Sequence, residues 1–210
     1  MIRYSPIKFK HTPARVEERN GWKIVLQYED EGTGPNLVDL SHIGKWDLQG
    51  EDLPSLRPAG IPIPENSKQC TPRRDYLINL IKWNWATIWH FSVDLPDFAG
   101  EYPFTNITEA YALLALIGKE TFAIMEKVTS LNLLSPLRKP PFLVLGPVLH
   151  IRSQVVVLSR DKDKSSVLLS CSRGYGQSMA DAMLDAGKEW GIKPGGENLF
   201  MDYRKLYFEN

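Results

Sequence analysis

The alternation of side chains along Trp85–Ser92 constrains the fold more than any other feature of the sequence. One set of positions holds Trp85, Thr87, Trp89 and Phe91, and the set between them holds Ala86, Ile88, His90 and Ser92. The preceding run, Tyr76–Trp83, is apolar and has few helix formers, and Asn84 is a turn residue between the two runs. A period of two on either side of a turn residue is typical of a β-hairpin.

The remaining segments add strands and two helices. Tyr111–Ile117 reads as a buried strand that ends at Gly118, and Gln154–Leu158 and Ser166–Ser172 read as a second hairpin with a charged tip. Lys119–Leu131 has apolar side chains three apart, which favours a helix. Gln177–Trp190 reads as the last helix, with Ser178 as its expected N-cap and with Gly191 and Pro194 as its stop signals.

Proline and the order of these elements fix the fold class. Five prolines lie between Pro54 and Pro72, and Ile61–Pro64 is expected to be an extended connector, neither helix nor central strand. Strands, a hairpin, a strand, a helix, a hairpin and a helix follow one another along the chain. The sequence therefore predicts an α+β fold, with helices packed on antiparallel sheets.

Composition narrows the class of protein. The 210 residues suffice for one large domain or two small ones, and 25 Lys and Arg balance 25 Asp and Glu, so no net positive field favours nucleic acid or an anionic membrane. Cys70 and Cys171 are expected to be free thiols in a reducing cytoplasm, with a disulfide as the alternative. No Cys-x-x-Cys occurs and the histidines are far apart, so no metal site is expected.

Four elements in a fixed order carry a family resemblance. They are Gly21-Trp22, Gln27-Tyr28, the turn Asp39-Leu-Ser-His-Ile-Gly44 and Gly50-Glu-Asp52. This order resembles the N-terminal signature of the folate-binding family that contains the glycine-cleavage T-protein (aminomethyltransferase) and the gamma subunit of heterotetrameric sarcosine oxidase. Thr105–Gly118 resembles a further segment of the same family, in which an apolar strand is followed by a helix. Gly146–Leu158, Ser166–Tyr175 and the helix that ends at Glu189–Ile192 resemble the end of the gamma subunit.

The resemblance implies a domain organisation. Residues 1–210 are expected to form a single unit like the folate-binding part of aminomethyltransferase, or two subdomains that divide near residues 100–105. The C-terminal barrel domain of the longer family members is expected to be absent.

The resemblance also assigns site residues. The transferases carry a glycine pair before an Asp-Asp-Leu-Ile strand start, whereas this chain has Pro72-Arg-Arg-Asp75-Tyr-Leu-Ile78. Asp75 is the expected catalytic carboxylate, because an oriented negative charge stabilises a cationic transition state. The alternative is a surface carboxylate paired with Arg73 or Arg74. His42 and Tyr76 are the expected ligand-binding residues, with a structural, hydrogen-bonded His42 as the alternative. The implied cofactor is tetrahydrofolate, although the family's Gly-Tyr-Thr-Gly-Glu loop is replaced by Arg160-Asp-Lys-Asp-Lys164.

Three functions are compatible with these residues. The first is an accessory subunit of one-carbon or amine metabolism with a degenerate catalytic site, like the gamma chain of sarcosine oxidase. The second is a minimal tetrahydrofolate-dependent aminomethyltransferase or demethylase. The third is a non-enzymatic, folate-binding regulatory protein. The aromatic hairpin is expected to expose a surface for a larger oxidase-type subunit or a second copy of the chain, unless its aromatic side chains are core residues.

Overall fold

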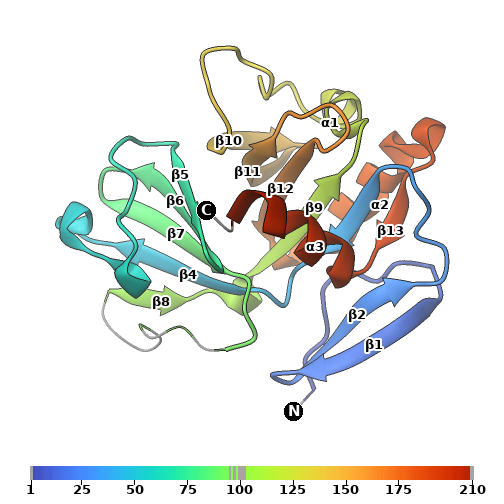
Figure 1. Cartoon of the computed structure of the whole chain (residues 1–210), viewed down its shortest axis with the longest axis horizontal. Helices are drawn as coiled ribbons and strands as arrows, with labels where there is room; N and C mark the ends of the chain where they lie inside the picture. Colours follow the sequence, from blue (N-terminus) through green and yellow to red (C-terminus); the bar gives the residue numbers. More distant parts are fainter. Residues whose placement is uncertain (1, 95, 97, 99–102, 209–210) are drawn as a thin grey trace.

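A computed structural model describes residues 2–94, 96, 98 and 103–208 of the chain. In this part of the chain, three helices accompany three sheets, which have two, five and six strands. The five-stranded sheet lies at one end of the molecule, and the six-stranded sheet with its helices lies together with the two-stranded sheet at the other (Figure 1). The architecture is α+β with largely antiparallel sheets, which confirms the fold class predicted from the sequence.

The six-stranded sheet has the order β10-β11-β12-β9-β3-β13, and only β13 and β3 pair in parallel. Its strands are, in chain order, β3 (Asn36–Asp39), β9 (Tyr111–Ile117), β10 (Phe142–Val148), β11 (Ile151–Ser159), β12 (Ser166–Ser172) and β13 (Lys193–Gly195). Both of its faces are covered, so its strands read as continuous apolar runs rather than as alternating ones. The expected strand at Tyr111–Ile117 and the second expected hairpin are confirmed.

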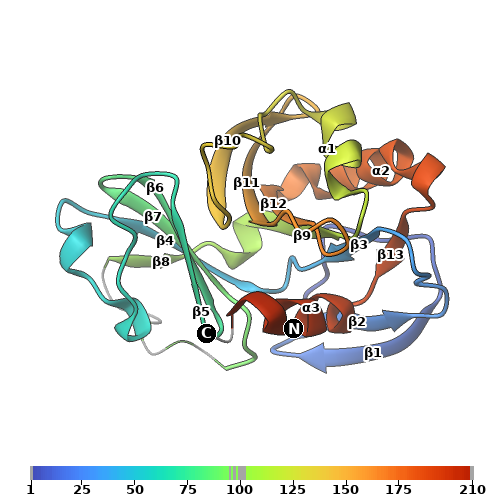
Figure 2. The same ribbon diagram turned by 45° about the horizontal axis from the view of Figure 1, so that its top comes forward.

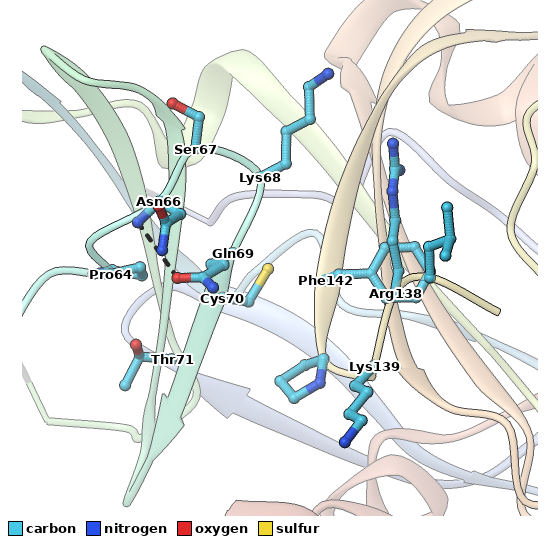
Figure 3. Close-up of a pocket in the computed structure, with 12 residues that line it drawn as sticks. Pro64, Asn66, Ser67, Lys68, Gln69, Cys70, Thr71, Arg138, Lys139 and Phe142 are labelled. Carbon is cyan, nitrogen blue, oxygen red and sulfur yellow. Dashed lines mark hydrogen bonds between the residues drawn. The ribbon is translucent and has the colours of Figure 1, made fainter. Parts of the chain in front are cut away.

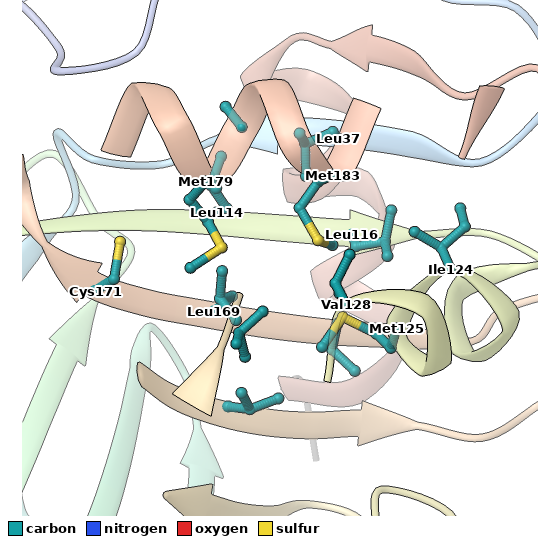
Figure 4. Packing of buried hydrophobic residues seen from close by; sticks show 14 of the residues in the cluster. Leu37, Leu114, Leu116, Ile124, Met125, Val128, Leu169, Cys171, Met179 and Met183 are labelled. Carbon is teal, nitrogen blue, oxygen red and sulfur yellow. The ribbon is translucent and has the colours of Figure 1, made fainter. Parts of the chain in front are cut away.

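Two helices cover one face of this sheet. Helix α1 (Thr121–Val128) and helix α2 (Gly176–Ala186) place Met125, Met179 and Met183 against Leu114 and Leu169 of the sheet (Figure 4). Both helices were expected from their apolar spacing, and both are shorter than expected.

The ends of α2 differ from the expectation. Ser178 lies inside α2, whose N-cap residue is Tyr175, so the N-cap prediction was wrong. After α2 the chain makes a 3₁₀ turn at Lys188–Trp190 and leaves it at Gly191 with φ 67°. That left-handed conformation suits glycine, so Gly191 ends the 3₁₀ turn. Helix α2 itself ends earlier, with Gly187 as its C-cap, so the predicted stop of the helix at Gly191 was wrong.

The five-stranded sheet contains the predicted hairpin and packs against the other face of the six-stranded sheet. Its order is β5-β6-β7-β4-β8, and its strands are β4 (Gly44–Gln49), β5 (Cys70–Arg73), β6 (Tyr76–Lys82), β7 (Trp85–His90) and β8 (Phe104–Asn106). Leu77 and Trp89 face the six-stranded sheet, whereas Ile78 and Ile88 face the proline-rich segment that covers the outer side.

Burial on both sides corrects the expectation of an aromatic interaction surface on the hairpin. Trp89 and Phe91 are 1% and 3% exposed, and Trp85 is half-buried. Only Trp83, in the turn between β6 and β7, is largely exposed, at 63%. The alternative, that the hairpin aromatic side chains belong to the core, holds for Trp89 and Phe91.

The proline-rich segment forms two short 3₁₀ turns, at Leu53–Ser55 and Pro58–Gly60. Ile61–Pro64 has no regular structure, as expected, and Ile61 and Ile63 are buried against the outer face of the five-stranded sheet. The connector is therefore part of the core rather than a free linker.

The C-terminal helix α3 (Glu197–Phe208) was not predicted from the sequence. It follows β13 and lies between the two-stranded sheet, formed by β1 (Pro13–Arg19) and β2 (Trp22–Tyr28), and the lower end of β5 (Figures 1 and 2). Phe200 and Phe208 are fully buried, and their rings lie 5.3 Å and 5.5 Å from that of Phe91. The division into subdomains expected near residues 100–105 falls partly on residues 100–102, outside the described residues, and stays a prediction.

Candidate functional site

The turn Ser41–Gly44 is held by hydrogen bonds from three directions. The Ser41 amide donates to Asp39 Oδ1 at 2.9 Å, and the Ser41 hydroxyl accepts from the amide of Leu113 at 3.3 Å. Lys45 Nζ donates to the carbonyl oxygens of Ser41 and Ile43, each at 2.8 Å. A Cβ atom at Gly44 would overlap the ring of Trp46, so glycine is required there. The turn is therefore fixed before any ligand is considered.

Lys45 is an unusual cation, because it is fully buried. Burial lowers its pKa to about 7, against an opposing effect of the Asp39 carboxylate. Its ammonium group donates to the two carbonyl oxygens of the turn and has no solvent contact. We therefore assign Lys45 a structural role in the turn.

His42 leaves the turn toward α3 and meets a buried carboxylate. His42 Nε2 lies 2.7 Å from Glu197 Oε1, and Arg19 of β1 forms two further hydrogen bonds to the two oxygens of Glu197. The side chains of His42 and Glu197 are 10% and 3% exposed. His42 is thus a hydrogen-bonded member of a buried cluster, as in the structural alternative for this residue.

The charge state of Glu197 follows from its partners. Burial by itself raises the pKa of a carboxyl group, but the hydrogen bonds and positive charges of His42 and Arg19 outweigh burial and bring the pKa of Glu197 to about 2. Glu197 is therefore an ionised acceptor at neutral pH. Because a carboxylate can only accept, His42 Nε2 carries the hydrogen of the contact between them.

Asp75 is also paired with α3. Arg204 Nη1 lies 2.6 Å from Asp75 Oδ1, and the same nitrogen donates to the carbonyl of Arg74 at 3.3 Å. The Asp75 side chain is 43% exposed and that of Arg204 is 15% exposed. The alternative expected for Asp75 was a surface pair with Arg73 or Arg74; the observed partner is Arg204, which is distant in sequence.

Tyr76 contacts an aromatic ring of its own sheet. It pairs with His90 across β6 and β7, and the two rings stack with centroids 4.4 Å apart. His90 in turn lines a cavity of about 400 Å³, together with His42, Gly44, Trp46 and polar side chains that include Asn106 and Glu109. This cavity lies at the turn and the end of β7, and no residue of β6 lines it. The ligand site that the sequence places at the turn and the start of β6 stays a prediction.

The surroundings of the three expected site residues overlap at His42, which both contacts α3 and lines the cavity. His42 and Asp75 are each held by a charged residue of α3, and Tyr76 packs behind His90 at the cavity. Sequence reasoning missed Glu197 and Arg204 because it missed their helix. The apolar positions Phe200, Tyr203 and Tyr207 recur at helical spacing and were a signal for it.

A larger cavity, of about 510 Å³, opens where the two large sheets meet. Residues of the segment 64–71, before and in β5, form one wall, and residues of the segment 137–142, before and in β10, form the other (Figure 3). Glu65, within the first segment, does not line the cavity. Sequence reasoning did not single out this place. Within the described residues, no group of three or more His, Cys, Asp and Glu side chains is placed to hold a metal ion.

Comparison with known proteins places the fold. No family model matches the sequence. No curated protein matches it either. A chain of heterotetrameric sarcosine oxidase from Corynebacterium sp. U-96, solved in complex with pyrrole 2-carboxylate, superimposes with a TM-score of 0.64 and 10% sequence identity. The match covers 78% of this chain and 91% of the other, so the two chains share a fold.

Proposed function

We propose that this protein is a cytoplasmic accessory subunit of an oxidase-type enzyme of amine or one-carbon metabolism, without a folate-dependent transferase site of its own. Two lines support the proposal. The chain shares its fold with a chain of heterotetrameric sarcosine oxidase, and its ordered sequence elements resemble the gamma subunit of such enzymes. Fold alone does not fix function, so the state of the expected site residues carries the argument.

The single observation that carries the proposal is the pairing of Asp75 with Arg204 at 2.6 Å. A transferase of this type needs a carboxylate that faces the cationic nitrogen passing between amine and folate. A guanidinium that already neutralises the carboxylate removes that electrostatic stabilisation, and its own charge repels an iminium or ammonium group. His42 is engaged in the same way by Glu197.

One experiment separates the accessory role from the transferase role. The tagged chain is purified from its source cells, and the eluate is assayed for flavin absorbance, for a second polypeptide in stoichiometric amount and for oxidation of sarcosine. We expect a flavoprotein partner, and we expect Asp75→Asn to leave the oxidase rate of the complex unchanged. A purified chain that transfers a one-carbon group to tetrahydrofolate, and loses this activity in Asp75→Asn, would establish the transferase role instead.

A second candidate is a folate-binding protein that is not a catalyst. The cavity beside His90 and Trp46 favours it, because a site of about 400 Å³ is within the range for small-molecule ligands and these rings lie at its wall. Calorimetric titration with tetrahydrofolate decides between the candidates. The accessory role predicts no heat of binding, whereas saturable binding that a Gly44→Ala substitution weakens would favour the folate-binding protein.

A further inference from the structure

The cavity between residues 64–71 and residues 137–142 lies at a backbone junction of the two large sheets. Gln69 and Phe142 form an isolated antiparallel bridge, and the amide of Leu143 donates to the carbonyl of Lys68 at 2.8 Å. Lys68 has φ 70°, a left-handed conformation that costs energy for a lysine. We call this cavity the junction cleft. Clefts between packed units are frequent small-molecule sites.

Charge in the junction cleft has one sign. Lys68, Arg138 and Lys139 line it, and no acidic residue does. Within the described part of the chain, none of these three side chains has a carboxylate within ion-pair distance. The whole chain has as many acidic as basic residues, so this local excess is not a consequence of composition.

Arg160 adds a further positive charge behind the cleft wall. Its guanidinium donates to the carbonyl oxygens of Leu133, Ser135 and Arg138 at 2.8–3.0 Å, and it lies over the ring of Phe142. Burial and the neighbouring charge of Arg138 lower the pKa of Arg160. The loop that carries Arg138 and Lys139 is therefore held in place by a cation that has only neutral acceptors.

The three charges that line the cleft are spread along it, and its middle is less polar. Lys68 and Arg138 extend toward one end of the cleft and Lys139 toward the other, while Cys70 points across the gap toward Phe142 (Figure 3). Pro64, Pro141 and Leu137 complete the apolar part of the lining. A ligand that fits this arrangement has anionic groups near both ends and a short carbon or phosphoanhydride link between them.

We propose that the junction cleft binds a small organic or inorganic polyanion whose charges are carboxylate or phosphate groups. The site goes beyond the accessory role and does not depend on it. Positive side chains at both ends attract such a ligand, and Arg138 offers a planar fork that suits either group. The backbone contacts of Lys68 and Gln69 with β10 join the two walls, and Arg160 holds the wall that carries Arg138 and Lys139.

The test is calorimetric titration of the full chain with citrate and, separately, with pyrophosphate, and glycerol serves as the uncharged control. We expect at least one polyanion to bind, more weakly as the salt concentration rises. Lys68→Gln and Lys139→Gln should each weaken binding by about threefold, as for exposed charges, and Arg138→Gln by about tenfold, as for a half-buried charged donor. Which polyanion binds distinguishes a carboxylate ligand from a phosphate ligand.

A matched variant controls for net charge. The cleft triple, Lys68→Gln, Arg138→Gln and Lys139→Gln, removes two lysines and one arginine. The control triple, Lys8→Gln, Arg15→Gln and Lys23→Gln, removes the same charges from exposed positions in or just before the two-stranded sheet, none of which lines the cleft. Loss of binding in the cleft triple alone supports the site. Equal affinities of the two triples, or binding of an acidic peptide when neither small polyanion binds, would overturn the proposal.

Chemical modification of Cys70 tests ligand binding independently of calorimetry. Cys70 lines the cleft, whereas Cys171 is buried at 1% exposure, so a thiol reagent at alkaline pH should modify Cys70 alone. Burial raises the pKa of both thiols, and more so for Cys70, so the alkaline condition is necessary and the exposure of Cys70 rather than its pKa makes the modification selective. The bound polyanion should slow this modification in the wild type and in the control triple, but not in the cleft triple. Unslowed modification in the wild type at a saturating polyanion concentration would place the ligand elsewhere.

Discussion

Around α3, each charged side chain that points inward meets an opposite charge from the chain itself, whereas around the junction cleft three cations meet none among the described residues. Glu197 is held by His42 and Arg19, and Asp75 is held by Arg204. Lys68, Arg138 and Lys139 share a cleft without an acid. The contrast separates charges that stabilise the fold from charges that are available to a ligand, because a group already paired inside the protein has little left to offer.

The comparison bears on how site residues are assigned by resemblance. The resemblance points to His42 and Asp75, which the structure places in internal pairs. The cleft, which no family element marks, has the volume and the unbalanced charge of a binding site. Five substitution or pH experiments sharpen or break this contrast, taken from the largest expected effect to the smallest.

The largest effect is expected for Phe200→Ala in α3. Phe200 is fully buried against Phe91, so the substitution should lower the free energy of unfolding by about 3–5 kcal/mol through lost burial and a residual cavity. Chemical denaturation measures it, with Leu206→Ala, exposed at 52% on the same helix, as the control. A decrease in the free energy of unfolding of less than about 1 kcal/mol would mean that α3 contributes little to the folded core, and that its charge pairs are not part of that core.

Glu197→Gln should cost about 3 kcal/mol, because it leaves the largely buried Arg19 guanidinium without the counter-charge of Glu197. Glu17 is the matched control: its carboxylate contacts the same arginine at 3.2 Å but is 46% exposed. Glu17→Gln should change the free energy of unfolding by about 0.5 kcal/mol or less. Equal effects of the two substitutions would remove the distinction between the buried cluster and an ordinary surface pair.

The same carboxylate predicts a pH dependence. The pKa of Glu197 lies at about 2 in the folded protein against 4.5 ordinarily, so its contribution to stability is full above pH 4.5 and is lost as the pH falls to about 2. Wild type should lose up to about 1.4 kcal/mol per pH unit more than Glu197→Gln across this window. Urea unfolding at several pH values measures the difference. Parallel curves for the two proteins would contradict the assigned ionisation.

Asp75→Asn should have a smaller effect, about 1 kcal/mol or less, because the pair with Arg204 is partly exposed and screened by solvent. A double-mutant cycle with Arg204→Gln isolates the pairwise interaction. The exposed pair of Arg3 and Glu109 provides the reference cycle. If Asp75→Asn instead raised the free energy of unfolding, the carboxylate would destabilise the folded protein, as is expected of a residue with a catalytic role.

The smallest effect is expected at the cleft. Lys139 is exposed and has no ion pair with any described residue, so Lys139→Gln should change the free energy of unfolding by about 0.5 kcal/mol or less in the absence of a ligand. With a saturating polyanion, wild type should gain thermal stability over the variant, because a ligand that binds only the folded state stabilises it. Loss of stability in the variant without ligand would give Lys139 a structural role and would weaken the contrast with α3.

Much of the secondary structure could be predicted because its signals are local. The hairpin of β6 and β7 was read from alternation and from Asn84, and β9 was read from seven apolar residues before Gly118, whose φ is 119°. The α+β class followed from the order of such elements. The inner side of the hairpin could not be read, because both of its faces are buried and an apolar residue satisfies either one.

What the sequence alone determined is therefore the set of elements, their order and the fold class, since periodicity, proline and glycine act within a few residues. Only the tertiary structure decided what the site residues do. Glu197 lies 155 positions from His42, and Arg204 lies 129 positions from Asp75, so no local pattern links them. The walls of the junction cleft likewise come from segments about seventy residues apart, which meet only when the two sheets pack. A charge becomes a structural pair or a binding group according to what packing places beside it, and packing is a property of the whole chain.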